Sequence, residues 1–199
     1  DNVCIAARDI DGDGKVEVAV GTNWNPGETT SEDQSGGVWF VGSLGKIRPK
    51  QLSHEPTTHR MQWVRESSGF SLVVAPLHGR DNKGGAGENG SKIYAYEAGD
   101  DAYASSWTLR LLDDRFHETH NFDVIPNDSN RAESLVLAGA EGLSFSELSD
   151  GGEHALPIDG LNNGAGEIRV GMLNSRREAS MIAAIEPMHG NNVVLYQRQ

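Results

Sequence analysis

Short apolar or alternating stretches recur along the chain, separated by turns and by loops rich in glycine and asparagine, and helical periodicity is nearly absent. The stretches fall into four groups of three that share one internal order. The groups comprise residues 3–7, 15–20 and 37–41; 59–64, 71–75 and 92–96; 120–125, 134–138 and 142–146; and 167–171, 180–185 and 192–196. Bridging stretches lie at 46–52, 107–112 and 154–158. The pattern therefore predicts repeats of four strands, each about 45–60 residues long.

Repeats of this size and strand content are typical of β-propeller blades. We expect one all-β propeller domain over residues 1–199, with blades at approximately residues 1–55, 56–113, 114–159 and 160–199. A β-sandwich, which also has many short strands and turn signals, is the alternative. The shared order of the four groups favours the propeller. The fourth group has no outer strand and no spare strand precedes the first group, so we expect about four blades of a larger ring.

Composition supports this picture and excludes several classes of protein. Glycine accounts for 24 of 199 residues and hydrophobic residues for only 37%, as expected for short strands joined by many tight turns. The net charge is −12, from 17 basic and 29 acidic residues, which argues against nucleic-acid binding. No apolar run approaches the ~20 residues of a membrane span, so no membrane insertion is expected, and no signal peptide is visible. The single cysteine excludes an intramolecular disulfide and a cysteine-rich zinc site.

Acidic residues alternate with small residues in the turn between the first two predicted strands, over Asp9–Glu17. Alternating carboxylates converge when such a loop curls, and glycines allow the left-handed turns that this requires. We expect calcium to be bound by the side chains of three aspartates and one glutamate and by one backbone carbonyl. The side chains are those of Asp9, Asp11, Asp13 and Glu17, and the carbonyl is that of Lys15. The loop is not an EF-hand, because its twelfth position is Val20. A solvated acidic turn is the alternative, and a bound calcium ion is expected to be structural.

Four of the seven histidines occupy equivalent positions in different repeats. His59 and His120 begin the innermost strands of the second and third repeats, and His78 and His189 follow a second strand in Pro-Leu-His-Gly and Pro-Met-His-Gly. In a propeller these positions lie on one face, so we expect them around one mouth of the central channel, opposite the calcium loop. Nearby polar residues are expected to be Arg60, Arg80, Arg169, Asn121, Glu167 and Glu186.

Two interpretations of the histidine cluster remain open. The imidazoles cap blade ends through hydrogen bonds to the backbone, or they have a function. In the functional interpretation they hold a metal such as zinc, or act as general acid and base. His117 and His120 are spaced to chelate a metal, although a simple bend explains the same spacing. His54 and His154 lie in bridging segments and are expected at the surface.

The acidic turn resembles the loop of FG-GAP/VCBS repeats, which occur in integrin-type and carbohydrate-associated propellers. A closer resemblance rests on the segments 59–63, 73–80, 117–122, 164–169 and 186–191. These segments are similar to the N-terminal propeller of the aldos-2-ulose dehydratases, and propeller-type ulvan lyases are looser relatives. The resemblance implies a ring of about seven blades with bound metal, which eliminates water or an alkoxide from a sugar.

The sequence therefore predicts a carbohydrate-active lyase or dehydratase that acts on a keto-sugar or a uronate. Its candidate catalytic residues are His78, His120, His189, Arg60 and Arg80. Calcium is the expected cofactor, and zinc or another divalent metal bound by His59, His78, His120 and His189 is a second candidate. The alternative is a non-catalytic, calcium-stabilised propeller that binds glycans or protein partners. Further blades or domains of the same polypeptide are expected partners, and a secreted or periplasmic location is slightly favoured.

Overall fold

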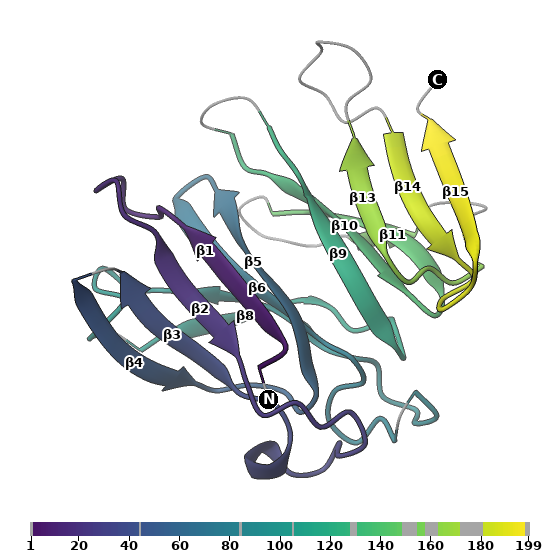
Figure 1. Cartoon of the computed structure of the whole chain (residues 1–199), viewed down its shortest axis with the longest axis horizontal. Coiled ribbons are helices and arrows are strands. Elements are labelled where there is room, and N and C mark those ends of the chain that lie inside the picture. Colours follow the sequence, from purple (N-terminus) through teal and green to yellow (C-terminus); the bar gives the residue numbers. More distant parts are fainter. Residues whose placement is uncertain are drawn as a thin grey trace.

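Four antiparallel sheets follow one another along the chain in the computed structural model (Figure 1). The structure describes residues 2–43, 45–83, 85–104, 106–127, 131–148, 155–157, 163–171 and 181–197. Each strand pairs with the next strand in the sequence, so every sheet is a meander. The all-β fold class predicted from the sequence is confirmed. None of the described residues belongs to a helix that is long and apolar enough to span a membrane.

The strands coincide closely with the predicted apolar and bridging stretches. The first sheet contains β1 (Cys4–Arg8), β2 (Glu17–Gly21), β3 (Val38–Ser43) and β4 (Lys46–Leu52), with a short 3-10 helix, η1 (Glu32–Gln34), before β3. The second contains β5 (Thr58–Glu66), β6 (Gly69–Pro76), β7 (Ile93–Glu97) and β8 (Thr108–Asp113). The third contains β9 (Thr119–Ile125), β10 (Ser134–Gly139), β11 (Gly142–Glu147) and β12 (Ala155–Pro157). The fourth contains β13 (Ile168–Gly171), β14 (Met181–Glu186) and β15 (Asn192–Gln197).

The amino-acid pattern of each strand follows its position in its sheet. β6 and β10 are second strands covered on both faces, and accordingly their central residues form continuous apolar runs that are buried. β4 is an outer strand and is mostly exposed. It carries three basic residues and a proline, which discourage another strand from pairing with the free edge.

Consecutive sheets pack face to face around three apolar cores. Phe40 and Trp63 lie in the core between the first and second sheets, and Phe122 lies between the second and third. Val136 and Ile168 belong to the core between the third and fourth sheets. The first strands of the sheets, β1, β5, β9 and β13, therefore come into contact in chain order (Figure 1). This arrangement brings residues at the same repeat position together.

The two outermost sheet faces expose large apolar side chains. On β15, Val193 and Leu195 are 70% and 63% exposed. They pair in register with Ile185 and Ala183 of β14, so all four side chains share one face. On β1, at the other end of the series, Ile5 is 65% exposed.

Candidate functional site

Three imidazole rings and one indole ring form a continuous row at one end of the sheets. The ring centroids of His59 and His120 are 5.2 Å apart, and those of His120 and His189 are 4.7 Å apart, both pairs in edge-to-face contact. Trp24 stacks on His59 at 5.0 Å with an interplanar angle of 26°. The predicted meeting of these three histidines is therefore present, because His59 and His120 occupy the starts of adjacent first strands. His189 reaches them from the turn after β14, with a left-handed φ of 61°.

Burial changes the protonation of the row. His59 is 8% exposed, and this burial, followed by the charges of Arg60 and His120, lowers its pKa from 6.5 to about 3. Burial also lowers the pKa of His120, and the neighbouring His189 and Arg60 act in the same direction. These two imidazoles are therefore neutral at pH 7. A neutral imidazole accepts a proton or binds a metal, but it cannot donate a proton as an imidazolium acid.

The ring nitrogens give support to both interpretations of the cluster. A hydrogen bond to the backbone of His120 raises the pKa of His59, and one to the backbone of Gly166 raises that of His120, each opposing the larger effect of burial. This is the arrangement expected of blade-end caps. The Nδ1 atoms of His59, His78 and His120, however, are buried and lack a hydrogen-bond partner. Buried polar atoms are rarely left unpaired, so these nitrogens are candidates for binding a ligand.

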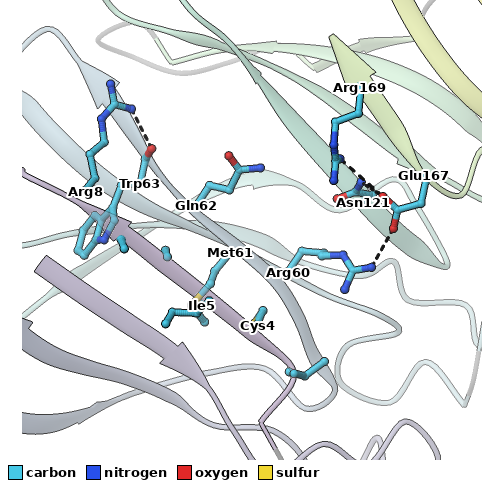
Figure 2. Close-up of a pocket in the computed structure, with 13 residues that line it drawn as sticks. Cys4, Ile5, Arg8, Arg60, Met61, Gln62, Trp63, Asn121, Glu167 and Arg169 are labelled. Atoms are coloured by element: carbon cyan, nitrogen blue, oxygen red, sulfur yellow. Dashed lines mark hydrogen bonds and ion pairs between the residues drawn. The ribbon is translucent and has the colours of Figure 1, made fainter. Parts of the chain in front are cut away.

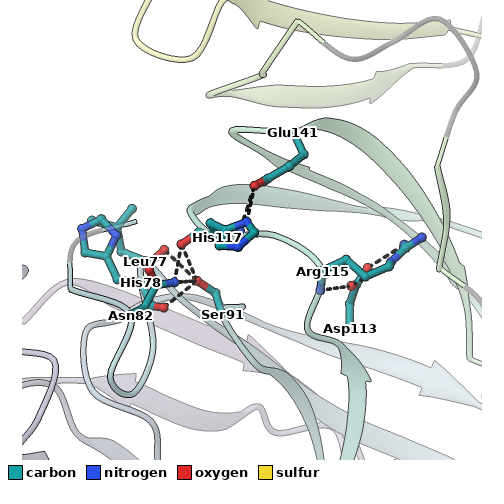
Figure 3. Close-up of polar contacts among 8 residues, drawn as sticks. All are labelled: Leu77, His78, Asn82, Ser91, Asp113, Arg115, His117 and Glu141. Atoms are coloured by element: carbon teal, nitrogen blue, oxygen red, sulfur yellow. Dashed lines mark hydrogen bonds and ion pairs between the residues drawn. The ribbon is translucent and has the colours of Figure 1, made fainter. Parts of the chain in front are cut away.

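His78 is fixed by its backbone in a turn after β6. Its N–H donates to Thr57 Oγ1 at 3.0 Å, and its carbonyl accepts from Ser91 Oγ at 2.7 Å (Figure 3). Ser91 Oγ and Asn82 Nδ2 also lie within hydrogen-bond distance of the His117 carbonyl, which ties this turn to the start of β9. Burial lowers the pKa of His78. The charge of His78 contributes to the lowered pKa of His59, but none of the ring contacts among the described residues includes His78.

A groove of about 570 Å³ lies beside the first strands of the sheets (Figure 2). Its lining includes Arg60 and Asn121, the residues that directly follow His59 and His120. Arg60 Nη2 lies 2.9 Å from Glu167 Oε1, and Asn121 Nδ2 donates to Glu167 Oε2 at 2.6 Å. Arg169 Nη1 lies 3.6 Å from the same carboxylate. Two guanidinium groups therefore share one carboxylate, which leaves a local positive charge in a protein of net charge −12. Such a groove suits a ligand that carries or develops negative charge.

Arg80 and His117 are placed apart from this groove. Arg80 donates its N–H to Glu55 Oε2 at 2.9 Å, and its Nε lies 4.0 Å from Glu55 Oε1. His117 Nδ1 lies 2.8 Å from Glu141 Oε1 in an exposed pair, whereas His120 turns into the ring row. His54 is only 7% exposed, so the prediction of a surface position was wrong. The connection between the first two sheets is itself packed against them. His154 lies outside the described residues.

Three carboxylates converge at the opposite end of the sheets. Oxygen atoms of Asp9, Asp11 and Glu17 all lie within 4.8 Å of one another, and this group could hold a metal ion. The Gly12 and Gly14 N–H groups donate to Asp9 at 2.7 and 2.9 Å, in a loop where both glycines have left-handed φ angles of 80° and 83°.

Asp13, another predicted ligand, does not belong to this carboxylate group, and coordination by the Lys15 carbonyl stays a prediction. Asp13 accepts from the Lys15 N–H at 2.8 Å and lies 3.5 Å from Lys15 Nζ. Within the described part of the chain, no other three His, Cys, Asp or Glu residues bring ligand atoms this close together. No three of the four histidines thus bring ring nitrogens within this distance of one another, and a metal bound by them stays a prediction.

Trp24 is the site residue that the repeat pattern did not identify. It lies between two asparagines in the loop between β2 and β3, outside every predicted strand. A large aromatic residue within such a polar loop is the signal that could have found it, since loops carry many binding residues.

Comparison with known proteins does not identify the chain. A scan against protein-family models finds no match, and neither does a search of curated proteins.

Proposed function

We propose that the four sheets are consecutive blades of a β-propeller. Three observations support this architecture: each sheet is a meander, the sheets follow chain order, and their first strands lie side by side. A β-sandwich instead packs two sheets against each other, so that strands distant in sequence share a sheet. The successive cores between neighbouring sheets favour the propeller.

We further propose that additional blades cover the two outermost faces. Val193 and Leu195 on one face and Ile5 on the other are more than 60% exposed. Large apolar side chains gathered on a sheet face indicate an interaction surface. The existing sheets bury similar side chains against one another, so sheets of the same kind would continue the packing and complete a larger ring.

We propose that this site catalyses the elimination of water or an alkoxide from a sugar. The observation that carries the proposal is a neutral imidazole, His120, whose pKa is lowered in part by the Arg60 guanidinium. Arg60 lines the groove, and so does Asn121, the residue that follows His120. Elimination next to a carbonyl requires a base for the adjacent proton and a positive group for the enolate that forms. A neutral imidazole and a guanidinium supply these two functions.

In this mechanism His120 takes the proton from the carbon next to the carbonyl or carboxylate. The electron pair moves onto the carbonyl oxygen, where Arg60 stabilises the negative charge. The enolate then collapses to a carbon–carbon double bond and expels the β-oxygen, which takes a proton from water. Glu167 and Asn121 hold the Arg60 guanidinium in position, and Arg169 offers a second cation to a keto-sugar or uronate.

A divalent metal at the histidines is not needed for these steps. Imidazole nitrogens are suitable zinc ligands, and three unpaired Nδ1 atoms are present. No three of the imidazoles, however, bring nitrogens within 4.8 Å of one another among the described residues. The side chains alone supply the base and the positive charge that the elimination requires.

A second candidate function is a cation-stabilised module that binds glycans or proteins without turnover. The convergence of Asp9, Asp11 and Glu17 favours it. Because this cluster lies at the end of the sheets away from the histidine row, a cation there would stabilise the fold without reaching the groove.

Activity assays with matched variants separate the two functions. The protein is incubated with oligogalacturonate and, separately, with fructose, and ultraviolet absorbance follows the new conjugated double bond. We expect turnover of one substrate class, with a loss of about 10²–10⁴-fold in His120→Gln and about 10²–10³-fold in Arg60→Lys. His117→Gln, which changes an imidazole outside the row, serves as the control and retains activity. Binding of the sugar without turnover would instead support the second function.

A further inference from the structure

The loop that carries Trp24 is rigidly held. Backbone bonds join Thr22 N–H to the Gly37 carbonyl at 2.9 Å and Gly36 N–H to the Asn23 carbonyl at 2.7 Å. Ser35 Oγ donates to the Asn25 carbonyl at 2.7 Å and also accepts the Thr57 N–H at 3.0 Å, and Ser35 is fully buried. The residues on both sides of Trp24 are thus anchored, and the anchor extends to the start of the second sheet.

This loop presents the indole at the buried end of the histidine row. One face of Trp24 rests on His59, which is 8% exposed and stays neutral because burial lowers its pKa. The indole itself is only half-buried. By contrast, Trp63 and Trp107 belong to the core between the first two sheets, where their Nε1–H groups donate to backbone carbonyls at 3.1 and 3.0 Å. Trp24 therefore offers a preformed aromatic surface that the core does not use.

The chemistry of this surface matches a sugar ring. A pyranose has an apolar face of C–H groups and a rim of hydroxyls, so it can place its face on a rigid aromatic ring while its hydroxyls bind polar groups at the edge. A fixed tryptophan also provides contact area at little cost in conformational entropy. His59, the residue beneath the indole, has a buried Nδ1 atom without a hydrogen-bond partner, and His78 has another.

The position of Trp24 also sets a minimum length for a ligand that contacts both the indole and the groove. His59, the ring beneath Trp24, directly precedes Arg60, whose side chain lines the groove. The register of β5 shifts between Thr58 and Arg60, so His59 and Arg60 do not follow regular strand alternation. The indole stacks on His59 and the guanidinium lines the groove, so they are neighbouring but separate binding elements. A single sugar at Arg60 would leave Trp24 free, whereas a longer glycan reaches both.

We propose that Trp24 is a stacking subsite for a second sugar ring, and that the ligand is a glycan of two or more residues. This inference rests on the proposed function at the groove and specifies its substrate class as an oligosaccharide. One ring lies on the indole while the adjacent ring occupies the groove at Arg60, Asn121 and Glu167.

The four indole N–H resonances of ¹⁵N-labelled protein provide a direct test. The protein is titrated with galacturonic acid and with its trimer, and the Trp24 resonance is assigned from its disappearance in Trp24→Phe. We expect the trimer to shift the Trp24 resonance saturably, while Trp63 and Trp107 stay unchanged. Trp24→Ala should weaken trimer binding about tenfold or more and leave monomer binding unchanged. Unmoved Trp63 and Trp107 resonances in this variant verify that the fold is intact.

Either of two results overturns the inference. One is a Trp24 resonance whose chemical shift does not change when the trimer is added, and the other is equal trimer affinity in wild type and Trp24→Ala. The outcome is separable from that of the proposed reaction. Turnover of the trimer with an unresponsive Trp24 would refute the subsite alone. Saturable binding at Trp24 without formation of a double bond would refute the elimination and retain the subsite.

Discussion

Acidification should destabilise the fold through His59 in particular. The pKa of this imidazole is 6.5 in its ordinary state and about 3 in the folded protein, chiefly because the ring is buried. The unfolded chain therefore binds a proton between these values that the folded protein does not bind. Stability is fully present above pH 6.5 and is lost as the pH falls toward 3. Each pH unit in this window costs about 1.4 kcal/mol, so a fall from pH 6.5 to 5 costs about 2 kcal/mol.

Burial also lowers the pKa values of His78 and His120, and these residues add to the loss in the same direction. The free energy of unfolding is measured by urea denaturation at several pH values between 7 and 5. In His59→Gln we expect lower stability at pH 7 and a slope that is smaller by about 1.4 kcal/mol per pH unit. An unchanged slope in His59→Gln would refute the assignment of a buried, neutral ring.

Three further predictions concern the acidic turn, an inter-sheet ion pair and a close backbone contact. Calcium at about one hundred times its dissociation constant should raise the unfolding free energy by about 2.7 kcal/mol. Thermal melts with calcium and with a chelator measure this gain, and Asp11→Asn should remove most of it. Arg8→Met leaves the buried Glu133 without its two bonds of 2.7 and 2.8 Å; urea denaturation should show a loss of about 1.5–3 kcal/mol, partly restored by adding Glu133→Gln. Gly139→Ala places a Cβ 2.4 Å from the Glu118 carbonyl oxygen and should cost about 1–3 kcal/mol or prevent folding, as judged by melting temperature and soluble yield.

The strands and their grouping could be predicted because they depend on local pattern. Alternation and short apolar runs mark where a chain segment is half or fully buried, and turns rich in glycine separate them. The meeting of His59 and His120 was also predictable, since equal positions in neighbouring repeats come together when first strands lie side by side. In the acidic turn, the alternation of carboxylates with small residues identified Asp9, Asp11 and Glu17.

The remaining features depend on contacts between residues distant in sequence. Arg60 meets Glu167 across 107 positions of the chain, and no local pattern indicates which carboxylate an arginine will find. Arg80 lies beside Glu55, with Nε 4.0 Å from Oε1, and does not line the groove. Trp24 becomes a site residue only because its loop is anchored beside His59. Asp13 was expected as a metal ligand, but Lys15 is close enough to pair with it.

The removal of a proton next to a carbonyl is the central step of the proposed mechanism and can be observed directly. The protein is incubated in D₂O with methyl galacturonide and, separately, with fructose, and NMR follows the exchange of the proton adjacent to the carbonyl or carboxylate. We predict exchange catalysed by the wild-type protein and lost in both His120→Gln and Arg60→Lys, with circular dichroism unchanged. Exchange that persists in both variants would show that the imidazole row and Arg60 do not perform this chemistry.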